Sequence, residues 1–282
     1  MSAIAAKPAG NAGAFQPVAS VIAIILAVIF IGAAYFLGSS GILACGAMLP
    51  VTTLVGIIVG AALIAFGVHF VPVGGAPAAM GQSPGIATGV AMLATGAGLA
   101  GLFGGAWAAS LGFGVALAGG AIGGGLMMAI TCLMVNISYV YGMGIPAASG
   151  KVAKDPITGD SQAEYKSQGT EGHGLPFISY VGGVIGGLFG GLGGTLIYIE
   201  LLDFYNASFP TLGIAANEAS SLAGIFAIGM FLVIAVLSAY NITGTIEGPH
   251  DPKFKRFPRA IIAAICASSI CGLVALLVVA IL

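Results

Sequence analysis

Seven long apolar runs constrain what this chain can fold into. They cover residues 18–38, 42–67, 86–105, 109–140, 176–202, 219–241 and 259–281. About 20 apolar residues in a helix cross the hydrocarbon core of a bilayer, and only helices or closed barrels can cross it. The runs lack the alternation of polar and apolar residues that marks a barrel strand. The sequence therefore predicts an all-α, polytopic transmembrane bundle with about seven spans.

The composition indicates an integral membrane protein and excludes a soluble catalytic domain. Of the 282 residues, 59% are hydrophobic and 6% are charged, whereas a soluble domain carries about 25% charged residues. The run at 18–38 is longer than the apolar region of a signal peptide, so we interpret it as a retained helix. We expect a short segment, 1–16, followed by a single integral membrane domain over 17–282.

The basic residues predict how the chain is oriented in the membrane. Seven spans place the segment 1–16 and the loops 68–85, 141–175 and 242–258 on one side. The opposite side carries the acidic residues Glu200, Asp203 and Glu218. The eight basic residues lie on or beside the first side: Lys7, Lys151, Lys154, Lys166, Lys253, Lys255, Arg256 and Arg259. The positive-inside rule then predicts a multi-pass protein of the cell membrane with a cytoplasmic N-terminus and an extracytoplasmic C-terminus.

Glycine spacing predicts unusually close helix packing. Two adjacent rows of glycines recur every four residues in the run at 176–202, and shorter pairs occur in the run at 109–140. Such rows remove side chains from a helix face, so that a neighbouring backbone can approach closely. We therefore expect the fifth run to lie at the centre of the bundle. The rows are Gly182, Gly186, Gly190 and Gly194, then Gly183, Gly187 and Gly191, and the pairs are Gly119 with Gly123 and Gly120 with Gly124.

The stretch from Gly67 to Gly85 is unlike an ordinary connector, because it holds three prolines and five glycines between two apolar runs. Proline fixes φ and glycine permits a tight turn, which suggests a re-entrant hairpin that lines a cavity. A structured connector that docks on a neighbouring protein explains the stretch equally well. His69 alone is better explained as a hydrogen-bonded structural residue than as a ligand or base. The candidate cavity residues are His69, Gly74, Gly75 and Gln82.

The string VHFVPVGGAPAAM at residues 68–80, with the glycine- and alanine-rich span that follows to Gly105, resembles the D-type membrane subunits of tetrahydromethanopterin S-methyltransferase. The resemblance extends from about Ala61 to Leu282, so the first run lies outside it. It implies a membrane complex of methanogenic archaea and their relatives. That complex moves a methyl group from methyl-tetrahydromethanopterin, or methyl-tetrahydrosarcinapterin, through a corrinoid to coenzyme M and exports sodium.

The resemblance also implies which partners and cofactors to expect. The corrinoid, a cobamide, is carried by another subunit, and sodium ion is the coupling ion. The implied partners are the sister C-type and E-type membrane subunits, the corrinoid, stalk and methyl-transferring subunits, coenzyme M and the lipid bilayer, but no nucleic acid. The chain would then be a non-corrinoid subunit with no active site of its own.

Three polar residues are candidates for a sodium path, because oxygen ligands suit a hard cation. Glu200 and Asp203 are three residues apart and share a helix face, and Asn136 ends the fourth run. A carboxylate in mid-membrane costs about 2.5–3.5 kcal/mol on insertion scales. A solvated helix end is the simpler explanation for the two acids, and an interfacial aromatic belt explains the tyrosines near Asn136.

Two other functions remain open at this point. A stand-alone secondary transporter or channel is suggested by the number of spans and by a weak parallel repeat. In that repeat, Pro-Ala-Ala occurs at 77–79 and 146–148, and each copy precedes a Gly-Leu-Phe-Gly-Gly word. A passive scaffold within the methyltransferase is suggested by the scarcity of polar residues in the spans.

Overall fold

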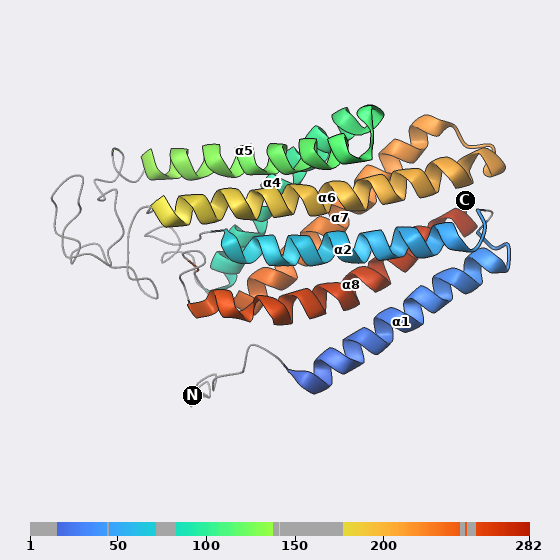
Figure 1. The fold of residues 1–282 in the computed structure, drawn as a ribbon, viewed down its shortest axis with the longest axis horizontal. Helices are drawn as coiled ribbons and strands as arrows, with labels where there is room; N and C mark the ends of the chain where they lie inside the picture. The colour runs from blue at the N-terminus through green and yellow to red at the C-terminus, as the bar shows by residue number, and fades with distance from the viewer. Residues whose placement is uncertain are drawn as a thin grey trace, which may run out of the picture.

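The computed structural model describes residues 16–43, 45–71, 83–137, 141, 177–242, 246 and 252–282, without the side chains of 83–95, 135, 136, 177–179, 216 and 252. These residues form long α-helices joined by short connectors, which confirms the predicted all-α bundle (Figure 1). The helices are α1 Pro17–Ser39, α2 Met48–Phe70, α4 Ser83–Ala108, α5 Phe113–Ile137, α6 Phe177–Leu212, α7 Ala216–Ile242 and α8 Phe257–Leu277, with 3₁₀ turns η1 Ala109–Leu111, η4 Pro252–Arg256 and η5 Val278–Ala280.

The number of spans is close to the seven predicted from the sequence. Six of the helices are long and apolar enough to cross a membrane. The seventh helix is α4. Its residues with described side chains, together with η1, form a shorter apolar segment, Gly96–Leu111. The chain is therefore a multi-pass membrane protein. Figure 1 shows the start of α1 and the C-terminus at opposite ends of the bundle.

The connector between α1 and α2 differs from the predicted boundaries. Gly41 and Gly46 adopt φ values of +77° and +78°, a left-handed conformation that interrupts helices and that glycine reaches without a steric penalty. The second helix consequently begins at Met48 rather than at residue 42. It also continues to Phe70, so that residues 68–70 are helical and do not belong to the predicted loop.

The largest difference concerns α6, which was expected to end at residue 202 but continues to Leu212. Its extra turns bury Phe204, Tyr205 and Phe209, and the Tyr205 hydroxyl donates a hydrogen bond to the Ala275 carbonyl oxygen at 2.9 Å. The helix extends because these aromatic side chains pack against the rest of the bundle. Of the polar residues between them, Asn206 is exposed, whereas Ser208 is buried and donates a hydrogen bond to the Phe204 carbonyl oxygen at 2.8 Å.

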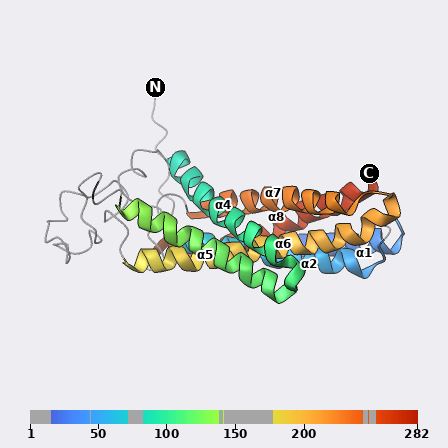
Figure 2. The same cartoon turned by 90° about the horizontal axis from the view of Figure 1, so that it is seen from above.

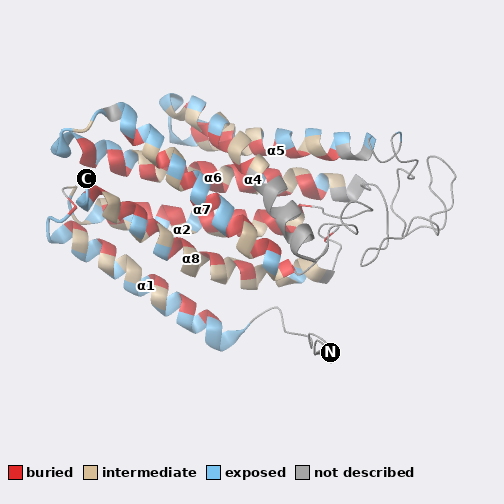
Figure 3. Ribbon diagram, turned by 180° about the vertical axis from the view of Figure 1, so that it is seen from behind, coloured by how far each residue is buried: buried red, intermediate tan, exposed pale blue. Residues whose placement is uncertain are grey.

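Helix α6 lies at the centre of the bundle, as predicted for the fifth run. It packs against α2, α4, α5 and α7, and Figure 1 shows α5 and α2 on either side of it. Turned by 90°, the bundle shows α4 inclined across the other helices, with α7 on the face away from α5 (Figure 2). The outer surfaces of α1 and α5 are largely exposed (Figure 3), and their exposed side chains are mostly apolar, as lipid contact requires.

The glycine rows of α6 face different neighbours. Gly187 and Gly191 lie against the backbone of Gly120 and Gly124 in α5. A Cβ on Gly187, Gly191 or Gly124 would collide with the facing main chain, and a Cβ on Gly120 would collide with the Thr195 side chain. On another face, a Cβ on Gly186 would lie 2.6 Å from the Gly67 carbonyl oxygen of α2. Real Cβ atoms do not approach this closely, so glycine is required at both contacts.

Phe231 of α7 fills the third glycine face. A Cβ on Gly194 would lie 3.0 Å from the Phe231 ring, and a Cβ on Gly98 of α4 would overlap that ring. The aromatic side chain thus occupies the space that these glycines leave open, and it is itself fully buried. The tight glycine packing predicted from the sequence is confirmed on α6.

One end of the bundle carries the basic residues that the structure describes. Lys253, Lys255 and Arg256 lie in η4, and Arg259 lies in the first turn of α8. The ends of α2, α5 and α7 and the start of α6 lie at this same end, on the left of Figure 1. We call it the basic end. Its cytoplasmic location stays a prediction.

Candidate functional site

The structure describes only part of the predicted site. His69 lies in the last turn of α2, and Glu200 and Asp203 lie within α6. Gly74, Gly75 and Gln82 lie outside the described residues, so the cavity that they are proposed to line stays a prediction. Asn136 belongs to the last turn of α5, but its side chain is not described. The candidate residues whose side chains the structure describes are therefore Glu200, Asp203 and His69.

The side chain of Glu200 extends from α6 to the surface of α2. Its side chain covers Gly56, since a Cβ at Gly56 would lie 2.5 Å from the Glu200 Cδ atom. Beside it, the Thr53 hydroxyl donates a long hydrogen bond, 3.4 Å, to the main-chain carbonyl oxygen of Glu200. The absence of a side chain at Gly56 thus creates the space that the glutamate occupies.

The pairing with Gly56 places Glu200 deep within the bundle. Helix α2 begins at Met48 and has 23 residues, which corresponds to a length of about 34 Å at 1.5 Å per residue. Gly56 lies about 12 Å from its start and roughly 5 Å from its midpoint. Helix α6 continues beyond Glu200 to Leu212. Glu200 therefore lies inside the membrane-spanning part of the fold and not at a solvated helix end.

Asp203 lies one turn further along α6 and is exposed, whereas Glu200 is half-buried. Two carboxylates on α6 and the Thr53 hydroxyl on α2 are oxygen ligands of the kind that bind hard cations. Among the described residues, no group of three or more histidine, cysteine or acidic side chains is placed to hold a metal ion.

The structure does not bring Asn136 close to Glu200. Helices α5 and α6 run antiparallel, with Gly124 opposite Gly187. This register puts the last turn of α5 at the basic end, roughly 35 Å from Glu200 along the helix axes at 1.5 Å per residue. The three predicted residues thus form no single site. If the predicted sodium path exists, they would be separate positions along it.

His69 joins three elements at the basic end. Its ring is fully buried, and its Nδ1 lies 2.8 Å from the Ala65 carbonyl oxygen. A carbonyl oxygen only accepts, so Nδ1 carries the proton and donates. The Nε2 atom then accepts from Asn241 Nδ2 of α7 at 3.2 Å, and Asn241 also donates to the Arg256 carbonyl oxygen at 2.9 Å. The imidazole is neutral in this arrangement.

Sequence reasoning did not select Asn241, and it used Arg256 only to predict the orientation of the chain. The Arg256 guanidinium donates to the Ile242 carbonyl oxygen at 2.7 Å, so that η4 is tied to the end of α7. The available signal was an amide side chain, Asn241, at the end of an apolar run. Its meaning depends on the partner His69, which is 172 residues away in sequence. No local pattern contains that information.

Replacing Asn241 by alanine is expected to destabilise the protein by about 1–3 kcal/mol, because it leaves two acceptors unsatisfied, Nε2 of the buried His69 and the part-buried Arg256 carbonyl oxygen. The unfolding temperature in detergent should fall by several degrees. Asn217→Ala is the matched control, because Asn217 is exposed and its side chain bonds only Glu218 within the described residues. Equal unfolding temperatures for the two variants would contradict the bridging role of Asn241.

Taken together, the bundle of membrane-length helices, the close glycine contacts and the carboxylate inside the span define a polytopic α-helical membrane protein. Its described residues contain no grouped set of metal-binding side chains.

A family model for the D-type subunits of tetrahydromethanopterin S-methyltransferase matches residues 50–268. The chain therefore belongs to this family. Relatives with the same description include proteins from Methanosarcina mazei, 49% identical over 234 residues (80% of this chain and 94% of the relative), and Methanothermobacter thermautotrophicus, 50% identical over 230 residues (82% and 97%). A relative from Methanocaldococcus jannaschii is 42% identical over 235 residues (81% and 97%). The matched range begins after α1, which precedes it.

Proposed function

We propose that the chain is a membrane subunit of a methyltransferase complex that moves a methyl group from methyl-tetrahydromethanopterin, or methyl-tetrahydrosarcinapterin, through a corrinoid to coenzyme M while exporting sodium. In this proposal the corrinoid is bound by another subunit, and this chain helps to form the sodium path. Family membership supports its place in the complex. The position of Glu200 supports its role in the path.

The observation that carries the proposal is the carboxylate inside the span. An ionisable side chain in a membrane is costly and marks an ion or substrate pathway as a rule. Glu200 occupies space that Gly56 leaves free, between two helices that otherwise meet through apolar residues and glycines. A sodium ion beside Glu200 would neutralise the carboxylate and thereby remove part of the cost of its burial.

The residues at the basic end suit a different role. His69 and Asn241 fix the end of α2 against α7 and η4, and the stretch with Gly74, Gly75 and Gln82 follows directly in the sequence. We propose that this anchored end supports either a cavity for coenzyme M or a contact with the sister C-type and E-type subunits. Asn136, in the last turn of α5, would lie at the entrance of the sodium path from this end.

Three single substitutions in the assembled complex test the path: Glu200→Gln, Asp203→Asn and Asn136→Ala. Each complex is reconstituted into vesicles, and methyl transfer to coenzyme M is measured together with the uptake of radioactive sodium. We expect Glu200→Gln to lose most sodium uptake, and the exposed Asp203 and the distant Asn136 to have smaller effects. Full coupling in all three variants would contradict the path and favour the passive scaffold.

The stand-alone transporter is tested with the chain alone in the same vesicles. We expect no sodium uptake under an imposed sodium gradient, because the described helices meet backbone to backbone and leave little polar surface between them. Uptake by the isolated chain at a rate comparable to the complex would favour an independent transporter over a component of the methyltransferase.

A further inference from the structure

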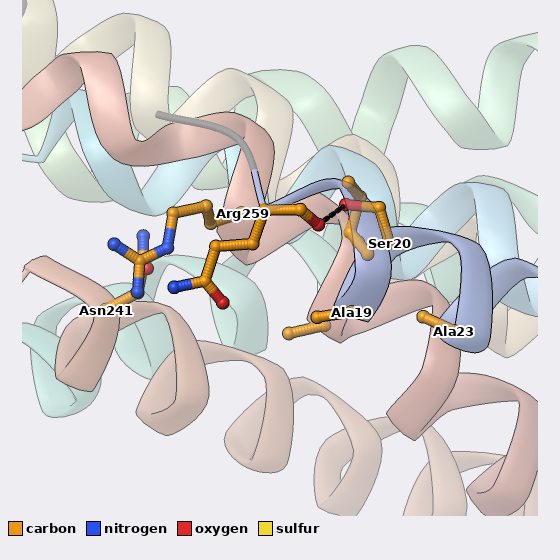
Figure 4. A pocket seen from close by; sticks show the side chains of 8 residues that line it. Ala19, Ser20, Ala23, Asn241 and Arg259 are labelled. Carbon is orange, nitrogen blue, oxygen red and sulfur yellow. Dashed lines mark hydrogen bonds between the residues drawn. The ribbon is translucent and has the colours of Figure 1, made fainter. Parts of the chain in front are cut away.

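A cavity of about 300 Å³ lies near the basic end, between α1 on one side and α7 and α8 on the other. It is roughly ten times the volume that one water molecule occupies in the liquid. Figure 4 shows Arg259 and Asn241 on one side of the cavity, with Ala19, Ser20 and Ala23 of α1 on the other. The lining residues are Gln16, Ala19, Ser20, Ala23, Asn241, Arg259, Ile262 and Ala263.

Arg259 gives the cavity a positive charge that its lining does not balance. The lining includes no acidic side chain. Within the part of the chain that the structure describes, Arg259 makes no hydrogen bond or ion pair. A guanidinium presents five N–H donors in a fork that matches the oxygens of a phosphate. An anion with several oxygen acceptors is therefore the ligand that this group would recognise.

The other polar groups of the lining leave few further donors. Both N–H groups of the Asn241 amide already donate, to His69 and to the Arg256 carbonyl. The Ser20 hydroxyl donates to the Gln16 carbonyl oxygen at 2.7 Å. The Gln16 side-chain amide can add a donor to those of Arg259. Recognition of an anion would thus depend mainly on Arg259.

The rest of the cavity is apolar and borders the lipid. Ala19, Ala23, Ile262 and Ala263 supply alkyl surface, while the outward face of α1 exposes Val18 and other apolar side chains. A cation beside an apolar wall matches an amphiphile that has an anionic head and hydrocarbon chains. A small hydrated anion from solution would gain nothing from the apolar wall.

The cavity exists because α1 is docked on the family fold. Residues 50–268 match the family model and include Asn241 and Arg259, whereas α1 precedes the matched range. Buried small residues, among them Ser20, Ala23 and Ala27, allow α1 to approach the bundle closely. The additional helix therefore adds one wall of the cavity to a surface that would otherwise face lipid directly.

We propose that this cavity binds the phosphate headgroup of an anionic membrane lipid, with Arg259 holding the phosphate and the alkyl chains lying along α1 and α8. The bound lipid fills the space between α1 and the bundle and fixes the position of α1. Since the cavity lies at the end of the spans, the headgroup stays at the level of the membrane surface.

The assembled complex, purified in a non-ionic detergent, is titrated with phosphatidylglycerol and with phosphatidylcholine, and the lipid retained per chain is measured by native mass spectrometry. We expect phosphatidylglycerol to be retained and phosphatidylcholine to be retained far more weakly. Arg259→Gln should lower phosphatidylglycerol retention roughly tenfold, because a charge-assisted hydrogen bond is lost. Arg259→Lys keeps the charge and should restore part of the retention.

Two further variants separate this site from general attraction to a basic surface. Lys255→Gln removes one charge from an exposed position of the same end, outside the cavity lining, and should lower retention by less than about threefold. Ala19→Phe, at an exposed position of α1, fills the apolar side without changing the charge and should lower retention as strongly as Arg259→Gln.

Two results would overturn the proposal. One is an equal loss of phosphatidylglycerol in Lys255→Gln and Arg259→Gln, which would indicate diffuse electrostatic attraction. The other is displacement of the lipid by millimolar inorganic phosphate with no effect of Ala19→Phe, which would indicate a site for a soluble anion.

Discussion

Replacing Gly191 by valine should prevent the bundle from assembling. A Cβ at Gly191 would collide with the Gly120 carbonyl oxygen and lie 3.2 Å from the Gly124 Cα atom, both backbone atoms of α5. Side chains can change rotamer to relieve such a contact, but a packed backbone cannot. The cost should exceed the roughly 1–3 kcal/mol typical of an overpacked core. We expect little folded protein in detergent, measured as the monodisperse fraction in gel filtration.

Gly229→Ala is the matched control for this experiment. Gly229 also lies inside a long helix, α7, but a Cβ there would meet nothing within 4 Å. Alanine is the better helix former by about 1 kcal/mol, so the control should fold as well as the unchanged chain. If Gly191→Val and Gly229→Ala give the same folded fraction, close backbone contact is not what holds α5 to α6.

The substitution Glu200→Gln should uncouple methyl transfer from sodium transport. Glutamine keeps the size and one oxygen acceptor of the side chain but cannot carry the charge that balances a cation. We expect sodium uptake per methyl group transferred to fall at least tenfold. The unfolding temperature should be unchanged or higher, because a carboxylate inside the membrane is costly to bury. Loss of sodium uptake together with an unchanged or higher unfolding temperature is the result expected for a residue that serves function at a cost in stability.

Glu200→Asp and Glu218→Gln complete the test. Aspartate keeps the charge but withdraws it by one methylene group, and should preserve part of the coupling. Glu218 is an exposed acid in the first turn of α7, where its loss should cost at most about 1 kcal/mol through the helix dipole and leave sodium uptake intact. A lower unfolding temperature together with normal sodium uptake in Glu200→Gln would assign the residue a structural role instead.

The fold was largely predictable because lipid imposes simple constraints on a chain. Length and apolar character were sufficient to place the helices, and the spacing of Gly187 and Gly191 was sufficient to predict close packing on α6. The end of α6 was not predictable in the same way. Its last turns are stabilised by Tyr205, which bonds to the Ala275 carbonyl oxygen far along the chain, and polar residues between the aromatics obscure the apolar pattern.

The candidate site was less predictable than the fold. The sequence identified Glu200 as a rare acid, but its depth depends on which residue of α2 lies opposite it. That residue is Gly56. The spacing of residues along one helix does not determine which residue of a distant helix lies opposite them. The same limit applies to His69, whose partner Asn241 comes from α7. Rare polar residues can thus be found in the sequence, whereas their partners require the structure.

Close contact between backbones has a mechanical consequence for how an ion can cross this protein. Helices that touch through Gly60 and Gly193, or through Gly120 and Gly191, cannot slide or rotate without main-chain collisions, so α2, α5 and α6 move as one rigid body. A rigid body of this kind cannot open a water-filled passage through its own interior. On the proposed sodium path, a hydrated ion would therefore approach the half-buried Glu200 from the outer surface of this body, where Asp203 is exposed one turn away and a neighbouring protein of the complex can form the opposite wall.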